Sequence, residues 1–189
     1  MTALQNSSSA MAVANNSLDE TIALITAGTE IVQDSSKVGN ALRTISMRIR
    51  GMNEETEELD DELVNIKGDV YELTNGKVSI MQDADTYKST TQVLREVAEV
   101  WDELSDKSQA NLLEKLFGKT RAQVGAAILS NFEQVEKALD VMSNSAGAAD
   151  REMDIITNSL EYKINALKET FTGIWQNLFQ REDMGVLVD

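Results

Sequence analysis

Apolar residues recur along this chain at alternating steps of four and three, the spacing of one face of an α-helix. The most regular run in the first third follows Asp34, Ser35 and Ser36, which offer a helix N-cap. It predicts a helix that begins there and keeps one apolar face directed inward. The residues of that face are Val38, Leu42, Ile45, Ile49 and Met52.

An earlier run predicts another amphipathic helix, from Ser17 to about Gln33. Ser17 and Glu20 fit the S-x-x-E capping box, in which each side chain binds the other residue's backbone N–H. Residues 1–16 have weak periodicity and predict a poorly ordered or helical lead-in. The residues expected to face inward in the helix are Leu18, Ile22, Ile25 and Val32.

The second half of the chain predicts four further helices. Ser89 opens one, Ser105 opens a short one that Gly118 ends, and another runs from about Thr120 to Ser143. The last has the longest regular stripe and predicts one long C-terminal helix, of the kind that packs on other helices like a coiled coil. Its stripe consists of Met153, Ile156, Leu160, Ile164, Leu167, Phe171, Ile174 and Leu178.

Residues 69–82 break the helical spacing and predict one small β-hairpin. Asn75-Gly76 is a strong hairpin signal, because both residues tolerate the positive φ of a type I′ turn. A two-residue loop pairs Leu73 with Val78 and Tyr71 with Ile80, which places four apolar side chains on one face. The fold class is therefore mainly α, with several amphipathic helices and this hairpin inserted among them.

Composition agrees with a helical chain and narrows its chemistry. The 189 residues include no Pro, Cys or His, which permits long helices and excludes disulfides, thiol nucleophiles and His-based metal or triad sites. The net charge of −15 excludes binding to DNA or anionic membranes by bulk attraction. No basic and apolar leader and no membrane-length apolar run is present. We predict no catalytic, cofactor-binding or metal-binding residues and no enzyme.

Two local charge patterns have alternative interpretations. Residues 53–62 hold seven acidic side chains and no basic one, which favours a solvated acidic helix start over a charge-paired hinge or docking patch. Asp83 and Asp85 suggest a calcium loop, but the required Gly and the twelfth-position Glu are missing.

The stretch Gly118-Lys119-Thr120 resembles the end of a phosphate-binding P-loop. The first glycine of that motif would fall at Leu113, and a helical pattern precedes it where a strand is needed. Thr120 and Gln123 instead fit a T-x-x-Q capping box for the next helix. We interpret the stretch as a junction between two helices.

Four stretches, taken in order, resemble the tail tape measure proteins of long-tailed bacteriophages and prophages. The family's small-x-x-G-x-A-L-R-T helix is similar to SSKVGNALRTISMRIRG (35–51), and its most recognisable segment to residues 94–133, which include LSDKSQANLLEKLFGK. NSAGAADREM (144–153) is similar to its turn, and SLEYKINALKETFTGIWQNLF (159–179) to its long helix. Residues 76–90 look like the hairpin of versions from phages of Gram-positive hosts.

The resemblance implies a structural virion protein that lies extended in the tail tube and sets tail length during assembly. The implied partners are the tail tube protein, the tail assembly chaperones and the tail-tip proteins, with self-association. The implied location is the virion tail interior, and the host bacterial cytoplasm during assembly. Family members are usually much longer, so we expect a fragment or a truncated reading frame.

The resemblance also suggests a domain division: a lead-in at 1–16, a helical core domain at 17–180 with the hairpin insertion, and a tail at 181–189 where the family would continue. Two other classes remain open from the residues alone. One is a non-phage cytoplasmic helical scaffold or adaptor. The other is an enzyme that uses Asp or Glu with Lys, which no motif supports.

Overall fold

The computed structural model describes residues 2–53, 55–56, 58–60, 63 and 65–145. Within these ranges the chain is mainly helical, with eight α-helices and one 3-10 helix. In chain order the elements are α1 (Thr2–Val13), α2 (Leu18–Val32), α3 (Ser35–Arg48), α4 (Ile66–Leu73), α5 (Thr90–Val100), η1 (Trp101–Glu103), α6 (Asp106–Phe117), α7 (Ala122–Ser130) and α8 (Phe132–Ser145).

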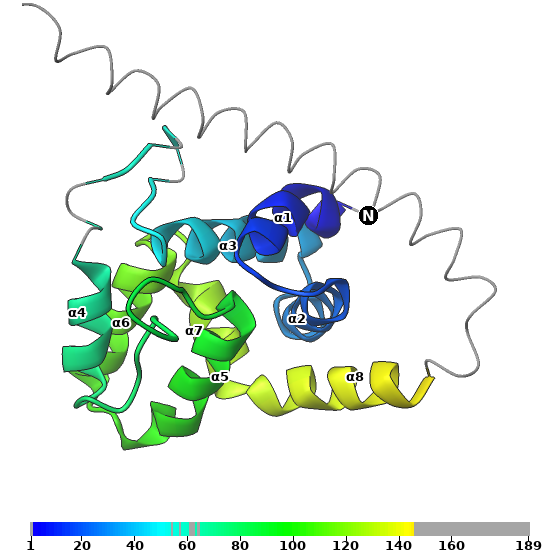
Figure 1. Ribbon diagram of the computed structural model, residues 1–189. Helices are drawn as coiled ribbons and strands as arrows, with labels where there is room; N and C mark the ends of the chain where they lie inside the picture. The colour runs from blue at the N-terminus through cyan, green and yellow to red at the C-terminus, as the bar shows by residue number, and fades with distance from the viewer. Residues whose placement is uncertain (1, 54, 57, 61–62, 64, 146–189) are drawn as a thin grey trace, which may run out of the picture. The chain divides into compact units, whose positions relative to one another are not determined.

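Residues 2–145 form one compact unit whose centre is α3. The predicted stripe of α3 is confirmed as core: Ile45 and Ile49 are fully buried, and Met52 is 5% exposed. Helix α1 lies along α3, while α2, α6 and α7 contact it from other sides (Figure 1). This unit is compact, because the amphipathic faces of the helices bury one another.

Small residues bring α1 very close to α3. A Cβ placed on Gly39 would lie 2.5 Å from the carbonyl oxygen of Ala3, which is backbone and cannot rotate away. Ala3, Ala10 and Ala14 are buried on the facing side. The weak periodicity of this segment thus belongs to a packed helix. Its buried residues are mostly small, together with Met11, which is fully buried and accepts a hydrogen bond from the Ser46 hydroxyl of α3.

Buried polar side chains connect the α1–α2 turn to the start of α5. The Asn16 side-chain oxygen accepts hydrogen bonds from the Thr91 backbone N–H at 2.8 Å and from its hydroxyl at 2.9 Å. The Asn16 amide donates to the Met11 carbonyl at 2.8 Å, so its amide group bonds on both sides. The hydroxyls of Ser46 and Thr90 lie 2.9 Å apart and join α3 to the same helix start.

The start of α2 is confirmed, but the face that it buries differs from the prediction. The capping box of Ser17 and Glu20 forms with both of its hydrogen bonds. The predicted inward residues, Leu18, Ile22, Ile25 and Val32, are only half-buried. Those buried in their place include Ala23, Leu24, Ala27 and Gly28.

The predicted β-hairpin at 69–82 is wrong. Its first half is α4, and the N–H groups of Asn75 and Gly76 donate to the carbonyls of Glu72 at 3.0 Å and Tyr71 at 2.7 Å. This pair is a Schellman motif, in which positive φ values (54° at Asn75, 79° at Gly76) end a helix. The same two residues suit a hairpin turn or a helix end. The described residues contain no strand, only two isolated bridges.

The acidic stretch at 53–62 does not start a helix in its described part. The Asn53 side-chain oxygen accepts from the N–H groups of Glu55 and Thr56, which is a turn. The chain then returns, and the Asp60 N–H donates to the Gly51 carbonyl at 2.9 Å. A side chain that binds the backbone two residues on competes with helix formation, which explains the loop.

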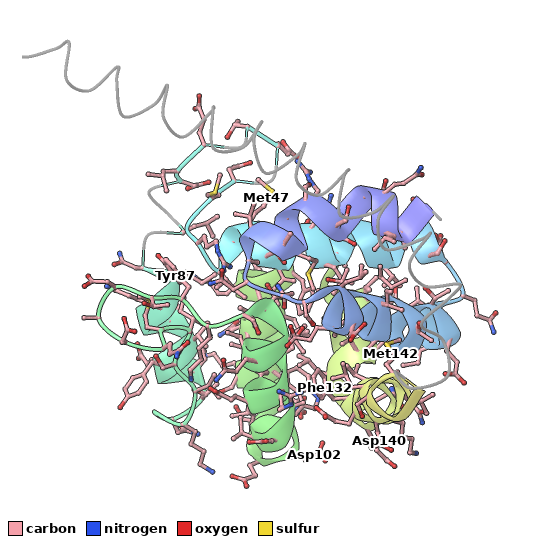
Figure 2. All side chains as sticks on the ribbon, turned by 45° about the vertical axis from the view of Figure 1, so that its right-hand side comes forward. Met47, Tyr87, Asp102, Phe132, Asp140 and Met142 are labelled. Carbon is pink, nitrogen blue, oxygen red and sulfur yellow. The ribbon has the colours of Figure 1, made fainter. Side chains whose placement is uncertain are left out.

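The single helix predicted from about Thr120 to Ser143 is two helices, α7 and α8. The break lies at Asn131, whose side-chain amide donates to the Ala127 carbonyl at 3.0 Å. Met142 lies on the side of α8 that faces α2, and Asp140 on the opposite side (Figure 2). The predicted long C-terminal helix and the tail at 181–189 lie outside the described residues.

Candidate functional site

The Gly118-Lys119-Thr120 stretch is a helix junction, as predicted. The Gly118 N–H donates to the Glu114 carbonyl at 2.9 Å and closes α6, with Gly118 at a φ of 70°. The Lys119 side chain is 82% exposed, and its ammonium lies 3.4 Å from the Glu114 carboxylate. The predicted capping box at Thr120 is wrong, because Arg121 occupies the N-cap of α7 and no side chain caps that helix.

Two contacts explain why this junction has its particular residues. A Cβ on Gly125 would lie 2.3 Å from the buried Phe117 ring, so α7 can pack on that ring only with glycine there. The Arg48 side chain of α3 donates to the Lys115 carbonyl at 2.8 Å, at the C-terminal end of α6. A cation there satisfies a free carbonyl and complements the helix dipole. The junction therefore serves packing.

The basic residues near α3 bind within the unit. Lys37 forms an ion pair with Asp34 at 3.2 Å. The Arg50 guanidinium lies 5.5 Å from the centre of the Tyr87 ring and donates to the Ser46 carbonyl at 3.3 Å. Burial lowers the pKa of Arg50 to about 10, so it stays charged at neutral pH. Arg50 therefore acts mainly as a packed cation over an aromatic ring.

The Asp83-Asp85 stretch is a polar turn. The Asp83 carboxylate accepts from the N–H groups of Asp85 and Thr86 at 2.9 and 2.8 Å. These hydrogen bonds lower the pKa of Asp83, because they stabilise its charged form. The carboxylate binds its own loop, which accounts for the acidic residue at this position.

A shallow polar pocket of about 380 Å³ lies between α4 and α6. It joins three carboxylates to Lys115, whose ammonium is 2.7 Å from the Asp69 carboxylate. The Lys115 side chain is 42% exposed, so water screens this pair. Its lining residues are Asp69, Glu72, Leu73, Asn111, Glu114 and Lys115.

A second hollow, of about 640 Å³, lies between α1 and α2 and is mostly apolar. Its floor includes Ile22, Ile25 and Thr29 of α2, and its wall comes from Ala3 and Leu4 of α1. The Thr29 hydroxyl oxygen is buried and has no hydrogen-bond partner among the described residues. We call this hollow the α1–α2 groove. It is lined by Ala3, Leu4, Ile22, Ile25, Thr26, Thr29, Glu30 and Ser35.

The sequence patterns did not identify this groove, although its signal is present. The stripe from Leu18 to Val32 was expected to lie inside the fold, and we find it half-buried, with Ile22 and Ile25 lining the groove. Among all the residues that the structure describes, no group of three or more His, Cys, Asp and Glu side chains is placed to hold a metal ion. None of the described helices has the length and apolar content that crossing a bilayer requires.

Comparison with known proteins bears on the first two thirds of the chain. Residues 1–118 match the model of the family described as phage-related minor tail protein. No solved structure matches the chain. The family match covers more than half of the 189 residues, so the chain belongs to this family. Membership supports a structural role in a phage tail.

Proposed function

We propose, from its place in the phage-related minor tail protein family, that this chain is part of a tail tape measure protein. The observation that carries the proposal is the family match over residues 1–118, which includes two of the resembling stretches in large part. The assignment to the tape measure proteins, rather than to minor tail proteins in general, rests on the order of the four stretches that resemble them. In this proposal the protein sets tail length while tube protein polymerises around it.

The proposed role is structural and involves other tail proteins as partners. The tail tube protein, the tail assembly chaperones and the tail-tip proteins are the candidates. We further propose that the compact unit of residues 2–145 serves attachment to them. A folded unit presents fixed surfaces for binding, whereas a measuring segment adds length only where it is extended.

Tail length tests this proposal directly. A rigid helical insert of about 20 residues, placed after Asp189 in the phage gene, adds about 30 Å of helix. We expect tails longer by about that amount in electron micrographs of the virions. The matched control carries the same number of residues as a flexible Gly/Ser loop between Asp83 and Asp85, an exposed turn of the folded unit.

The control should leave tail length unchanged, because a flexible loop bulges from the surface without separating the segments on either side of it. Unchanged tail length with the helical insert would contradict the measuring role and leave a minor tail protein of another kind. Absence of the chain from purified virions, together with binding to no tail protein in pull-downs, would favour the non-phage scaffold.

A further inference from the structure

The half-buried stripe of α2 has the spacing of a helix-packing seam. Leu18, Ile22, Ile25, Thr29 and Val32 follow one another at steps of four, three, four and three. This is the a/d spacing of a coiled coil, in which each side chain inserts between four residues of a facing helix. Within the described residues, α1 and Ser35 border this seam in the groove but do not cover it.

The opposite side of α2 already has its partners. Ala23, Leu24, Ala27 and Gly28 are buried, and Val38 of α3 and Ile128 of α7 lie beside Gly28. A Cβ on Gly28 would lie 2.8 Å from the Val38 side chain, so this side is tightly packed. The seam is therefore a half-buried apolar stripe beside the core, which Ile25 and Val32 contact from one side.

The acidic side chains near the groove indicate that its occupant carries basic residues. Helix α1 has no charged residue, and the three charged residues of α2 are all acidic: Asp19, Glu20 and Glu30. Asp19 and Glu30 are about three helical turns apart and both exposed, so they lie along the same edge of the seam with Thr26 between them. An occupant with Lys or Arg along its flank would be attracted to that edge.

The same charges argue against a second copy as the occupant. Two α2 seams that pack antiparallel about a two-fold axis would bring Asp19 of each copy beside Glu30 of the other. Like charges that face each other across a helix pair are destabilising. The net charge of −15 adds a general repulsion between copies.

We propose that the α1–α2 groove binds an amphipathic helix of another protein, with apolar residues at three- and four-residue spacing and Lys or Arg along one flank. The apolar side chains of that helix pack on Ile22 and Ile25 and exclude water from the groove. Its basic flank faces Asp19 and Glu30. This binding follows from the groove itself and does not require that the chain measure tail length.

A pair of synthetic peptides tests the proposal with the full chain. Both are fluorescent helices of about three heptads with Leu and Ile at the a and d positions. One carries Lys at the flanking positions and the other carries Glu. We expect the Lys peptide to bind with a Kd at least tenfold lower than that of the Glu peptide, and added salt to narrow the difference. Equal affinities would overturn the charge assignment.

Variants of the chain locate the binding. Ile25→Asp should weaken Lys-peptide binding at least tenfold, whereas Tyr71→Asp, at a side chain 55% exposed on α4, should leave it unchanged. Thr26→Arg changes an exposed position at the edge of the groove, so folding is preserved, and it should narrow the preference for the Lys peptide, because the added cation partly offsets Asp19 and Glu30. Unchanged preference in Thr26→Arg overturns the proposed site, whatever happens to Ile25→Asp.

A photo-reactive amino acid at position 22 identifies what occupies the groove. Cross-linking to the bound Lys peptide supports the proposal. Cross-links that form only within one chain, or only between two copies, while the peptide remains unlabelled, overturn it. Failure here leaves the tail-length experiment unaffected, and a failed tail-length experiment leaves the peptide result standing.

Discussion

Helices α2 and α3 have similar apolar stripes and different surroundings. In α3 every residue of the predicted stripe is buried, with Val38, Leu42 and Ile45 at 0% exposure. In α2 the predicted stripe is half-buried, and two of its residues, Ile22 and Ile25, line a groove. The difference shows that an amphipathic pattern predicts an apolar face reliably without predicting what covers it.

The reason lies on the other side of α2. Its Ala and Gly residues permit close approach to neighbouring helices, which buries that side even though the side chains are small. Close contact between backbones adds favourable dispersion energy. A search for large apolar residues in the sequence does not detect this contribution. Helix α3 has the same property at Gly39, where α1 approaches, and so is enclosed on several sides.

The largest expected effect compares the same substitution in the two stripes. Ile45→Ala in α3 should lower the free energy of unfolding by about 2–5 kcal/mol, because it leaves a cavity in a closed core. Ile22→Ala in α2 should cost less than about 1.5 kcal/mol, since the groove is open and no cavity forms. Urea denaturation of the two variants measures both values. Equal losses would show that the α2 stripe is as enclosed as that of α3.

A smaller effect is expected where α1 meets α3. Gly39→Ala should destabilise by about 1–3 kcal/mol, because the added methyl group meets the Ala3 backbone and forces the helices apart. Gly68→Ala in α4 is the matched control, since nothing lies within 4 Å of its new Cβ. It should stabilise by up to about 1 kcal/mol through helix propensity. Thermal unfolding of both variants distinguishes close packing from a general intolerance of alanine.

The smallest effect concerns how the two helices begin. Ser17 caps α2 with a hydroxyl, but Asp34 caps α3 with a carboxylate. The Lys37 backbone N–H and then its side chain lower the pKa of Asp34 below 3.8. Because the pKa of Asp34 is lower in the folded state than in the unfolded state, its ionised carboxylate stabilises the fold at pH values above the unfolded-state pKa. That stabilisation is lost as the pH falls through the folded-state pKa. Between about pH 4 and pH 2, wild type should lose more stability than Asp34→Asn.

Chemical-shift titration of the Asp34 carboxyl group measures its pKa directly, with Asp34→Asn used to assign the signal. A midpoint at or above the ordinary value would mean that the cap hydrogen bond to Lys37 does not form in solution. At neutral pH the variant should be nearly as stable as wild type, because Asn caps a helix as well as Asp does.

Local signals predicted local structure well. The capping box at Ser17 and the caps at Asp34, Ser89 and Ser105 all form, because each depends on residues within one turn. The junction after Phe117 was also predicted correctly, but the capping box predicted there at Thr120 does not form. The absence of a P-loop could be recognised because that motif needs residues at set spacings. Family membership then came from the comparison over residues 1–118.

Signals that depend on context were misassigned. Asn75-Gly76 has the positive φ values that were predicted, but they end α4 because Val70 and Ile66 bury against the core and hold the preceding residues in a helix. At Asn131 one side-chain hydrogen bond divides a continuous apolar stripe into two helices. In both places several conformations suit the local sequence, and tertiary packing selects one of them.

By itself the sequence determined a helical chain, the positions of most helix starts, and the lack of cysteine and histidine chemistry. It did so because caps and helical spacing act over a few residues, and composition needs no structure. Only the tertiary structure decided which apolar faces are enclosed. Burial depends on contacts between residues far apart in the chain, such as Ala3 with Gly39 or Asn16 with Thr91. That selection leaves the seam of α2 as the groove that we propose binds a partner helix.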